Sequence, residues 1–386
     1  MTAHPPLRKA PDHVVTLITA GDPLADAVVA ELDQYGAQAR RALDAGLTNG
    51  LASLDAEPPT AVAALLRQLE TPPSWVDPLM LHRGDVASLS VPPMWFQLCS
   101  LTSALAHSYA SPATARQLVR TGSATDIAAR RLAGSGVWAR QTVRPGGLLR
   151  GRPGYLATVE VRLRHARMRA DAVEDWDRGA EGLPIGQLDM ARTWLGFTFT
   201  AFRALDAVGI GMSPEEEHYL YQYWSYVAHL LGLDERLYQD VGDHAGACRL
   251  LDLLDFTTPA PDENSTTLTS AMIGAQARAM ADAPGVGLSE EQLRHLIHSV
   301  LRRTFGEEWG DHLGIPVVPS ATDLIPLISQ LNRQARYWQT YSPASAQEAR
   351  RRALAEPGPH LKAALPPRAR SCRKATEGDR PGVRAA

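Results

Sequence analysis

The spacing of hydrophobic and polar positions along this chain is typical of helices. Apolar positions follow helical spacing over most of the sequence, whereas the period-two alternation that marks a half-buried strand is nearly absent. We therefore predict an all-α fold. The helical stretches are expected over residues 24–43, 60–69, 93–109, much of 111–144, 154–170, 184–209, 213–233, about 235–255, 266–282, 289–305 and 321–340.

Two of these stretches are apolar on nearly every side, which predicts that they are buried in the core. They cover residues 93–109 and 184–209. Polar caps mark the start of three other helices, because a side-chain oxygen can accept the free N–H groups of a first turn. The caps are Asp22 and Ser111, each followed by proline, and Ser213, which begins a capping box.

The length and composition suit one large domain. With 386 residues, of which 45% are hydrophobic, the chain can bury a large core. We divide it into a flexible arm over 1–14, a single all-helical domain over 15–342 and a disordered basic tail over 343–386, rich in Ala, Pro and Arg. Residues 349–386 carry ten Lys and Arg against three Asp and Glu, so the formal net charge of −3 leaves an acidic body. An acidic body argues against nucleic acid as a partner.

Several functional classes are disfavoured by what the sequence lacks. No run of 18 apolar residues occurs, so no transmembrane segment is expected. The N-terminus has no secretory signal pattern, and Cys99, Cys248 and Cys372 lack the spacing of a disulfide framework or a thiolate zinc site. We therefore expect a cytoplasmic protein. No nucleophile elbow, P-loop or dinucleotide-binding glycine pattern is present either.

Three histidine-containing patterns are candidates for other kinds of site. Glu215 and His218 have the spacing of one di-iron carboxylate pair, but no second pair occurs at helical spacing. His295 and His298 lie one turn apart without an evident third metal ligand, so a solvated helix face is favoured. His229, in an aromatic-rich helix, is interpreted as a core histidine with satisfied hydrogen bonds.

The segment 154–170 carries the most unusual constellation in the chain. It follows a Pro-Gly turn and has the composition of a helix. His165 lies near its middle, with Arg162 one turn before it and Arg169 one turn after it, so all three are expected on one face. Two hypotheses stay open from the residues alone, a ligand-binding histidine and an incidental histidine on a solvated face.

At this point the sequence resembles a known family over about residues 72–340. The similar segments are PPSWVD at 72–77, YASPATARQLVRTG at 109–122, RRLAGSGVW at 130–138, RGRPGYLATVEVRLRHARMR at 150–169 and the long run from LPIGQLDMARTW to HLLGL at 183–233. Together they resemble the latex clearing protein (rubber oxygenase) family. That family shares its catalytic domain with the ER-bound oxygenase of mycophenolic acid biosynthesis.

The resemblance implies an all-helical fold with a globin-like core, additional helices, and haem b buried between helices. It implies that His165 is the proximal iron ligand and that Arg162 and Arg169 are the family's arginines around it. Guanidinium groups bind carboxylates through a bidentate fork, so these arginines are expected to pair with haem propionates or to surround the iron ligand. Arg131 matches a distal-pocket arginine, and Ser135 stands where the family usually has Thr.

The chain also departs from the family pattern. Gly134 stands where the family has a distal Lys, and the family's catalytic carboxylate has no clear match, Asp126 being the nearest candidate. Together with the missing export signal, this favours a smaller intracellular alkene or terpenoid over polyisoprene. We predict a haem b-dependent oxygenase that uses O₂ on a hydrophobic substrate and cleaves a C=C bond, with 93–109 and 184–209 lining the cavity. The alternatives are a non-catalytic helical haem- or lipid-binding protein and a purely structural helical domain.

Overall fold

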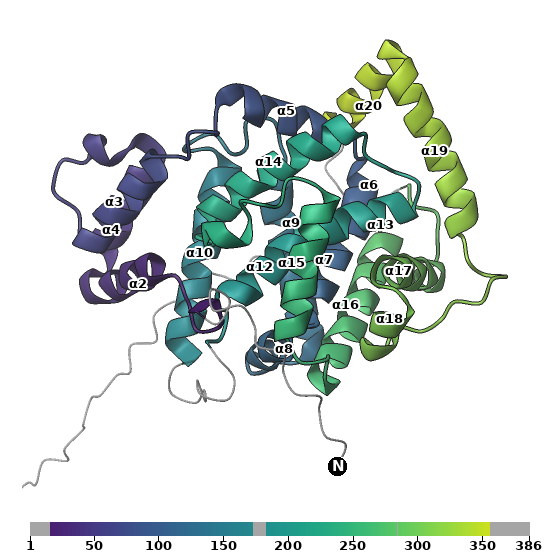
Figure 1. Cartoon of the computed structure of the whole chain (residues 1–386), viewed down its shortest axis with the longest axis horizontal. Helices are drawn as coiled ribbons and strands as arrows, with labels where there is room; N and C mark the ends of the chain where they lie inside the picture. The colour runs from purple at the N-terminus through teal and green to yellow at the C-terminus, as the bar shows by residue number, and fades with distance from the viewer. Residues whose placement is uncertain (1–15, 173–182, 284, 356–386) are drawn as a thin grey trace, which may run out of the picture.

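The structure, a computed structural model, describes residues 16–172, 183–283 and 285–355 (Figure 1). Within these ranges every regular element is a helix and no strand is present, so the all-α prediction is confirmed. The α-helices are α2 (Pro23–Tyr35), α3 (Ala37–Asn49), α4 (Thr60–Glu70), α5 (Pro78–Ser88), α6 (Pro93–Trp95), α7 (Thr102–Tyr109), α8 (Pro112–Val119), α9 (Ala124–Thr142), α10 (Pro153–Ala172), α12 (Gln187–Leu195), α13 (Ala201–Ala207), α14 (Pro214–Leu230), α15 (His244–Thr257), α16 (Glu263–Ala281), α17 (Glu290–Phe305), α18 (Glu307–His312), α19 (Ile325–Tyr341) and α20 (Pro343–Ala355).

The helices form a central body with a smaller group at each end. In the body α16 packs against α9, α7 and α17, and α14 packs along α5. The N-terminal helices α2, α3 and α4 lie together at one end, and α19 and α20 project at the other (Figure 1). Helix α10 connects the body with the N-terminal group, because it contacts α9 and α14 as well as α2.

The two stretches predicted to be buried do form the core, but neither is a continuous α-helix. The first runs from α6 through the π-helical turn η2 (Phe96–Leu101) into α7. The second runs from α12 through the π-helical turn η3 (Gly196–Thr200) into α13. Every residue of both π turns except Phe96 is buried, and the two turns contact one another. A π turn holds one more residue than an α turn, so it rotates the side chains that follow it.

The predicted caps are present, but one predicted helix is divided. Asp22 Oδ1 accepts from the N–H of Ala25 at 3.1 Å, and Ser111 Oγ accepts from that of Thr114 at 3.4 Å. The single helix predicted over 24–43 is wrong, because the chain breaks at Gly36 between α2 and α3. Gly36 has φ 55°, in the left-handed region that glycine adopts without steric cost.

Helical structure continues beyond residue 342, where the tail was expected to begin. Helix α20 extends to Ala355 and begins directly after Ser342. The carboxylate of Glu348 pairs with Arg351 and, at 2.8 Å, with Nε of Arg352, and pairs three and four residues apart stabilise a helix. Residues 356–386, like the arm at 1–14, lie outside the described residues.

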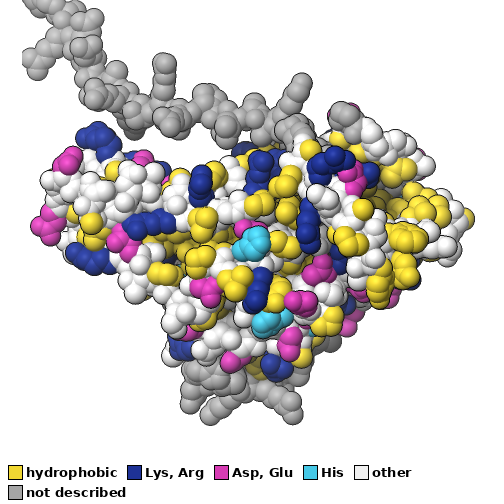
Figure 2. Space-filling model, turned by 90° about the horizontal axis from the view of Figure 1, so that it is seen from above, with side chains coloured by type: hydrophobic (Ala, Val, Ile, Leu, Met, Phe, Trp, Pro, Cys, Tyr) yellow, Lys and Arg dark blue, Asp and Glu magenta, His cyan; other side chains and the backbone are white. Residues whose placement is uncertain are grey.

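Helix α19 presents an apolar and aromatic face to solvent. Figure 2 shows hydrophobic side chains gathered at the end of the molecule that α19 and α20 form, whereas charges of both signs are interspersed at the opposite end. The exposed large hydrophobic side chains on α19 are Leu327, Leu331, Tyr337, Trp338 and Tyr341. No helix of the described residues is both long enough and apolar enough to cross a membrane.

His229, His298 and His107 are among the histidines that burial holds neutral. Burial lowers the pKa of His229 and of His298 to about 4, with nearby positive charges adding to the effect. The pKa of His107 also lies well below its usual value, because of burial and then the Arg192 cation. Nε2 of His229 has no hydrogen-bond partner within the described residues, so the prediction of a satisfied core histidine is wrong.

We expect the free energy of unfolding to fall as the pH drops from about 6.5 towards 4, because the unfolded chain binds protons that the folded protein excludes. Each such histidine contributes a slope of at most about 1.4 kcal/mol per pH unit in this window. Urea denaturation at successive pH values measures the slope. His298→Gln is expected to flatten it, while His82→Gln, at an exposed histidine, leaves it unchanged. Equal slopes in all three proteins would contradict the assignment.

Candidate functional site

A cavity lies between α9 and α10, which pack against one another in the body of the fold. Each of these helices contributes four residues at positions i, i+3, i+4 and i+7, the spacing of one helix face. The cavity is completed by α12, η3 and the chain that follows α14. Its lining residues are Arg131, Gly134, Ser135 and Trp138 of α9, Val161, Arg164, His165 and Met168 of α10, and Met190, Thr193, Trp194, Phe197, Leu231 and Leu233.

His165 reaches this cavity as a neutral imidazole with an unsatisfied nitrogen. Its Nδ1 is buried and has no hydrogen-bond partner among the described residues. The pKa of His165 is lowered to about 3, first by burial and then by the positive charges of Arg131, Arg169 and Arg164. The ring is therefore uncharged at neutral pH, so one of its two nitrogens has a lone pair that can bind a metal ion.

Arg131 and Ser135 line the cavity from α9, on consecutive turns of the helix. The Nε of Arg131 is buried without a hydrogen-bond partner in the part of the chain that the structure describes. Arg131 also lies near the fully buried Tyr109, whose pKa is raised by burial against the opposing effect of the guanidinium. An unpaired buried donor is costly, so this N–H group is available to a bound polar atom.

The side chains of Trp138, Trp194 and Phe197 form a rigid, apolar part of the cavity wall. The indole Nε1 of Trp138 donates to Thr158 Oγ1 at 3.0 Å, and that of Trp194 donates to the carbonyl of Trp224 at 2.7 Å. The ring of Phe197 meets Trp138 edge-on, with 4.9 Å between the centroids. Because their polar atoms are satisfied elsewhere, these rings present only apolar surface to the cavity.

Arg162 and Arg169 lie one turn before and one turn after His165 on α10, but neither lines the cavity. Arg162 donates from Nε and Nη2 to the two carboxylate oxygens of Asp22, at 2.6 and 3.0 Å, and this ion pair is almost completely buried. Arg169 donates from Nε to Asp26 at 2.9 Å and from Nη1 to the carbonyl of Ile185 at 2.9 Å. Both arginines therefore attach α10 to the N-terminal group of helices.

Arg164 is the arginine of α10 that lines the cavity, and the sequence motifs did not single it out. It is exposed and lies at the rim, next to Gly134. A Cβ atom added at Gly134 would have only Nη1 of Arg164 within reach, at 4.0 Å. The spacing along α10 could have indicated that Arg164 faces the same cavity as His165, because residues 161, 164, 165 and 168 share one helix face.

The match that decides the family is to the model described as "ER-bound oxygenase mpaB/B'/Rubber oxygenase, catalytic domain", which covers residues 88–340. The chain belongs to this family. A rubber oxygenase of Streptomyces sp. (strain K30) is 26% identical over 266 residues, which are 66% of this chain and 60% of that protein. The chain thus spans about three fifths of the length of this relative.

A solved structure of latex clearing protein in its closed state has a similar fold. The TM-score is 0.62 at 19% sequence identity, and the match covers 87% of this chain and 90% of that one. The likeness supports the helical fold, and the family expected from the sequence is confirmed.

A half-buried carboxylate, that of Asp189, lies in a second lobe of the cavity, and the sequence patterns did not indicate it. This lobe is also lined by Arg131, His165 and Ser108. Asp189 accepts hydrogen bonds from Ser111 Oγ at 3.0 Å, from Thr114 Oγ1 at 3.1 Å and from the N–H of Gly186 at 3.3 Å. Burial nevertheless raises its pKa.

The carboxylate suggested by the sequence lies elsewhere. Asp126 is exposed in the first turn of α9, where it accepts a hydrogen bond from Ser123 Oγ at 2.7 Å. It does not line the cavity or its second lobe. Of the two apolar stretches expected to line the cavity and its second lobe, 93–109 contributes only Ser108, in the second lobe. The stretch 184–209 contributes Ile185, Asp189, Met190, Thr193, Trp194 and Phe197.

The other histidine patterns do not form a metal site in the described part of this oxygenase-family chain. No group of three or more His, Cys, Asp or Glu side chains there is arranged to hold a metal ion. Glu215 accepts a hydrogen bond from Tyr219 at 3.0 Å on an exposed turn, and His298 is buried in α17. Cys99 and Cys248 are both free thiols.

The donor set of the cavity fits a haem. It offers one neutral imidazole with an unpaired nitrogen, an apolar aromatic wall for a flat macrocycle and an exposed arginine at the rim. The cavity measures about 60 Å³ in this conformation, room for a few water molecules. A macrocycle can therefore enter only if the lining side chains move apart. The space beside Gly134 is open, since a Cβ atom there would meet only Nη1 of Arg164, at 4.0 Å.

Proposed function

We propose that this protein is a haem b-dependent oxygenase that uses O₂ on a hydrophobic alkene. The observation that carries the proposal is the neutral imidazole of His165 with its unpaired Nδ1, which shares a small cavity of largely apolar lining with the unpaired Nε of Arg131. Membership of an oxygenase family supports it. The name of the rubber oxygenase relative says that it acts on rubber. For this chain we propose an isoprenoid or another alkene as the substrate class.

His165 would hold the iron of the haem, since it is the histidine whose free nitrogen faces no competing hydrogen-bond partner in this cavity. The bound haem would supply the redox chemistry that lets dioxygen attack an alkene. The role of the protein is then to orient the substrate, exclude water and place hydrogen-bond donors. The rings of Trp138, Trp194 and Phe197 would exclude water from the reacting atoms.

Arg131 and Ser135 would act from the opposite helix as hydrogen-bond donors. The Arg131 guanidinium is fixed by partial burial and stabilises negative charge that develops in the cavity, and the Ser135 hydroxyl donates from the next turn. We assign proton transfer to the Asp189 carboxyl rather than to Asp126, because only Asp189 shares a lobe with Arg131 and His165. Its raised pKa suits a group that both accepts and releases a proton.

The arginines of α10 would have two different tasks. Arg164, at the exposed rim, is the residue that we propose for the haem propionates, since guanidinium and carboxylate pair through a bidentate fork. Arg162 and Arg169 are already engaged by Asp22 and Asp26 and would set the position of α10, and hence of His165. Gly134 would leave space for the substrate or the macrocycle at the rim.

The direct test is an absorption spectrum of the protein purified from haem-supplemented cells. A Soret band of near-stoichiometric intensity is expected, followed by consumption of O₂ and formation of carbonyl products with isoprenoid alkenes of increasing length. A protein that binds haem yet consumes no O₂ with any of them would favour the non-catalytic haem- or lipid-binding alternative. A protein that stays colourless with added haemin would refute the proposal. The cytoplasmic location stays a prediction.

Replacement of Arg131 by leucine is expected to lower the rate of O₂ consumption by about a hundredfold, the usual effect of removing a donor that stabilises developing charge. The haem content should stay close to that of the wild type, because His165 is unchanged. Arg130→Leu is the matched control, since Arg130 is the neighbouring exposed arginine and donates to the carbonyl of Thr121 at 3.2 Å. Equal O₂ consumption by the two variants would remove Arg131 from the reaction.

A further inference from the structure

Helix α19 makes polar contacts to the body of the fold, whereas most of its large apolar side chains face solvent. Asn332 donates from Nδ2 to the carbonyl of Val208 at 2.8 Å. Arg336 donates from Nη2 to the carbonyl of Gly211 at 3.2 Å and to the carboxylate of Glu216 at 2.5 Å. A surface helix usually has the opposite arrangement, with its apolar side against the core. These polar contacts fix which side of α19 faces the body.

The exposed side of α19 carries a continuous apolar and aromatic surface, which we call the α19 stripe. Leu327, Leu331, Trp338 and Tyr341 follow one another at positions i, i+4, i+11 and i+14, and Tyr337 lies beside them. All five are more than half exposed. The centroid of the Tyr337 ring lies 4.7 Å from that of Tyr341 and 5.5 Å from that of Trp338. The sequence of α19 contains no Asp or Glu. A contiguous apolar patch of this kind marks an interaction site.

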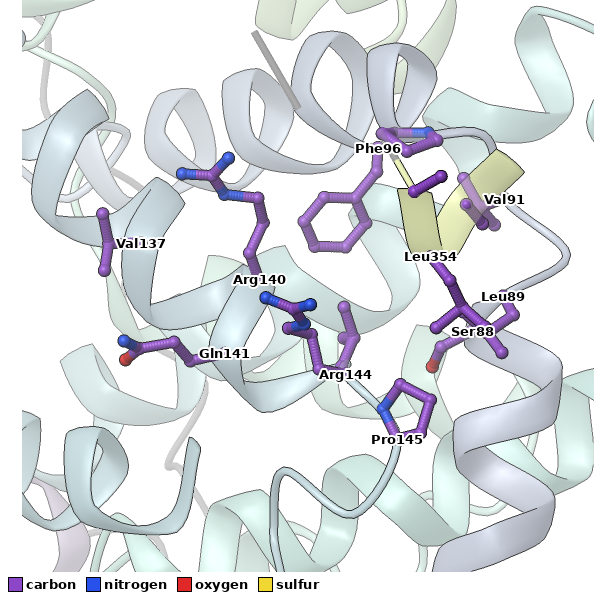
Figure 3. Close-up of a pocket in the computed structure, with 14 residues that line it drawn as sticks. Ser88, Leu89, Val91, Phe96, Val137, Arg140, Gln141, Arg144, Pro145 and Leu354 are labelled. Carbon is purple, nitrogen blue, oxygen red and sulfur yellow. The ribbon is translucent and has the colours of Figure 1, made fainter. Parts of the chain in front are cut away.

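The stripe belongs to a helix pair that is attached to the body at both ends. Ile325, at the start of α19, is buried. Helix α20 begins directly after α19 and Ser342, and Leu354, near its end, lines a cavity of about 480 Å³ together with Val91 and Phe96 (Figure 3). Because both ends of the pair contact the body, the stripe keeps a defined direction relative to it.

The sequence that follows the stripe is strongly basic. Arg350, Arg351 and Arg352 are exposed on α20, and Glu348 pairs with two of them. Residues 349–386 carry ten Lys and Arg against three Asp and Glu, a net charge of +7, although the whole chain has a formal net charge of −3. Positive charge is therefore concentrated in the part of the sequence directly after the apolar stripe.

We propose that the α19 stripe binds to the surface of an anionic lipid bilayer. Trp and Tyr favour the headgroup region, where a ring can be partly dehydrated while its polar atom stays in contact with water. Leucine side chains on an interfacial helix enter the boundary with the acyl chains. The Lys and Arg of residues 349–386 would add electrostatic attraction to the phosphates of anionic lipids.

Charge favours a bilayer over a second copy of this chain. A dimer formed through the stripe would cover the same apolar side chains, but it would bring together two segments that each have a net charge of +7. An anionic bilayer covers the stripe and supplies the opposite charge. The bilayer contact is also independent of the proposed haem, because none of the stripe residues lines the His165 cavity. The two proposals can therefore fail separately.

The test is co-sedimentation of the full-length protein with vesicles of phosphatidylcholine alone or mixed with phosphatidylglycerol in equal amounts. Binding to the anionic vesicles is expected to be tighter by at least about tenfold and to weaken as sodium chloride is added. Leu331→Gln/Trp338→Gln should weaken binding to the anionic vesicles by at least about tenfold. The matched control is Tyr35→Gln/Leu79→Gln, since it removes two exposed large hydrophobic side chains outside α19 and should bind as the wild type does.

Thermal unfolding of both double variants checks that each of them folds, as expected for changes to exposed side chains. Equal affinity for the two kinds of vesicle would overturn the proposal. Undiminished binding of the Leu331→Gln/Trp338→Gln variant to anionic vesicles would also overturn it, since the basic segment alone would then hold the protein. A dimer that sediments as such, is lost in this variant and binds no vesicle would assign the stripe to a second copy instead.

Discussion

Replacement of His165 by alanine is expected to abolish the Soret band of protein purified from haem-supplemented cells. The reason is that His165 supplies a neutral, unpaired imidazole nitrogen to the cavity, and it is the one histidine among the described residues that line it. The fold should survive the change, because Nδ1 makes no hydrogen bond within the described residues that the substitution would break. Absorbance in the Soret region, divided by protein concentration, measures the effect.

Two controls separate ligation from general damage. His218→Ala removes an exposed histidine of α14 that lies outside the cavity, and it should leave the Soret band unchanged. Addition of free imidazole to His165→Gly should restore part of the band, since the small ligand can occupy the space that the side chain leaves. A stoichiometric, unshifted Soret band in His165→Ala would show that another residue holds the iron.

Replacement of Asp22 by asparagine is expected to destabilise the protein by about 3–5 kcal/mol, the usual cost of leaving a buried charge without its partner. Arg162 is only 2% exposed and Asp22 4%, and Asp22 accepts two of the hydrogen bonds of the guanidinium. Asparagine keeps the size and the capping ability of aspartate at the start of α2, so the variant isolates the loss of charge. Urea denaturation gives the change in the free energy of unfolding.

The ion pair between Arg167 and Asp33 is a matched control on the same two helices. It has the same bidentate geometry, with both distances 2.6 Å, but its side chains are 39% and 59% exposed. Asp33→Asn is therefore expected to cost less than about 1 kcal/mol. The double variant Asp22→Asn/Arg162→Gln removes both buried charges and should be more stable than Asp22→Asn alone. A loss below about 1 kcal/mol in Asp22→Asn would contradict the assignment.

The positions of helices could be predicted largely from the sequence, and so could the residues that share a face within one helix. The residues alone single out His165, and the resemblance to the family implies Arg131 and Ser135. The structure brings all three to one cavity. The spacing of residues within one helix does not show which other part of the chain each helix face contacts. Arg162 and Arg164 are both close to His165 in sequence, yet one meets α2 and the other the cavity.

Long-range partners explain the remaining differences. Asp22 is recognisable as a helix cap, but its second partner lies 140 residues away, on α10. Asp189 was overlooked because the hydroxyl groups that hold it, on Ser111 and Thr114, come from a separate segment 75 and more residues earlier. Helix α20 was missed because a composition rich in Ala and Arg is shared by helices and disordered tails.

The π turn η3 gives this fold a way to change its specificity without substituting any residue of the cavity. Phe197, which lines the cavity, lies within η3. Insertion or loss of one residue along the segment from α12 to α13 would move or remove the extra residue of that turn and rotate the side chains beside it by about 100°. Relatives with similar residues but a different number of them in this segment would then present different side chains to their substrates. Insertions and deletions in this segment are therefore expected to change the substrate range as much as substitutions do.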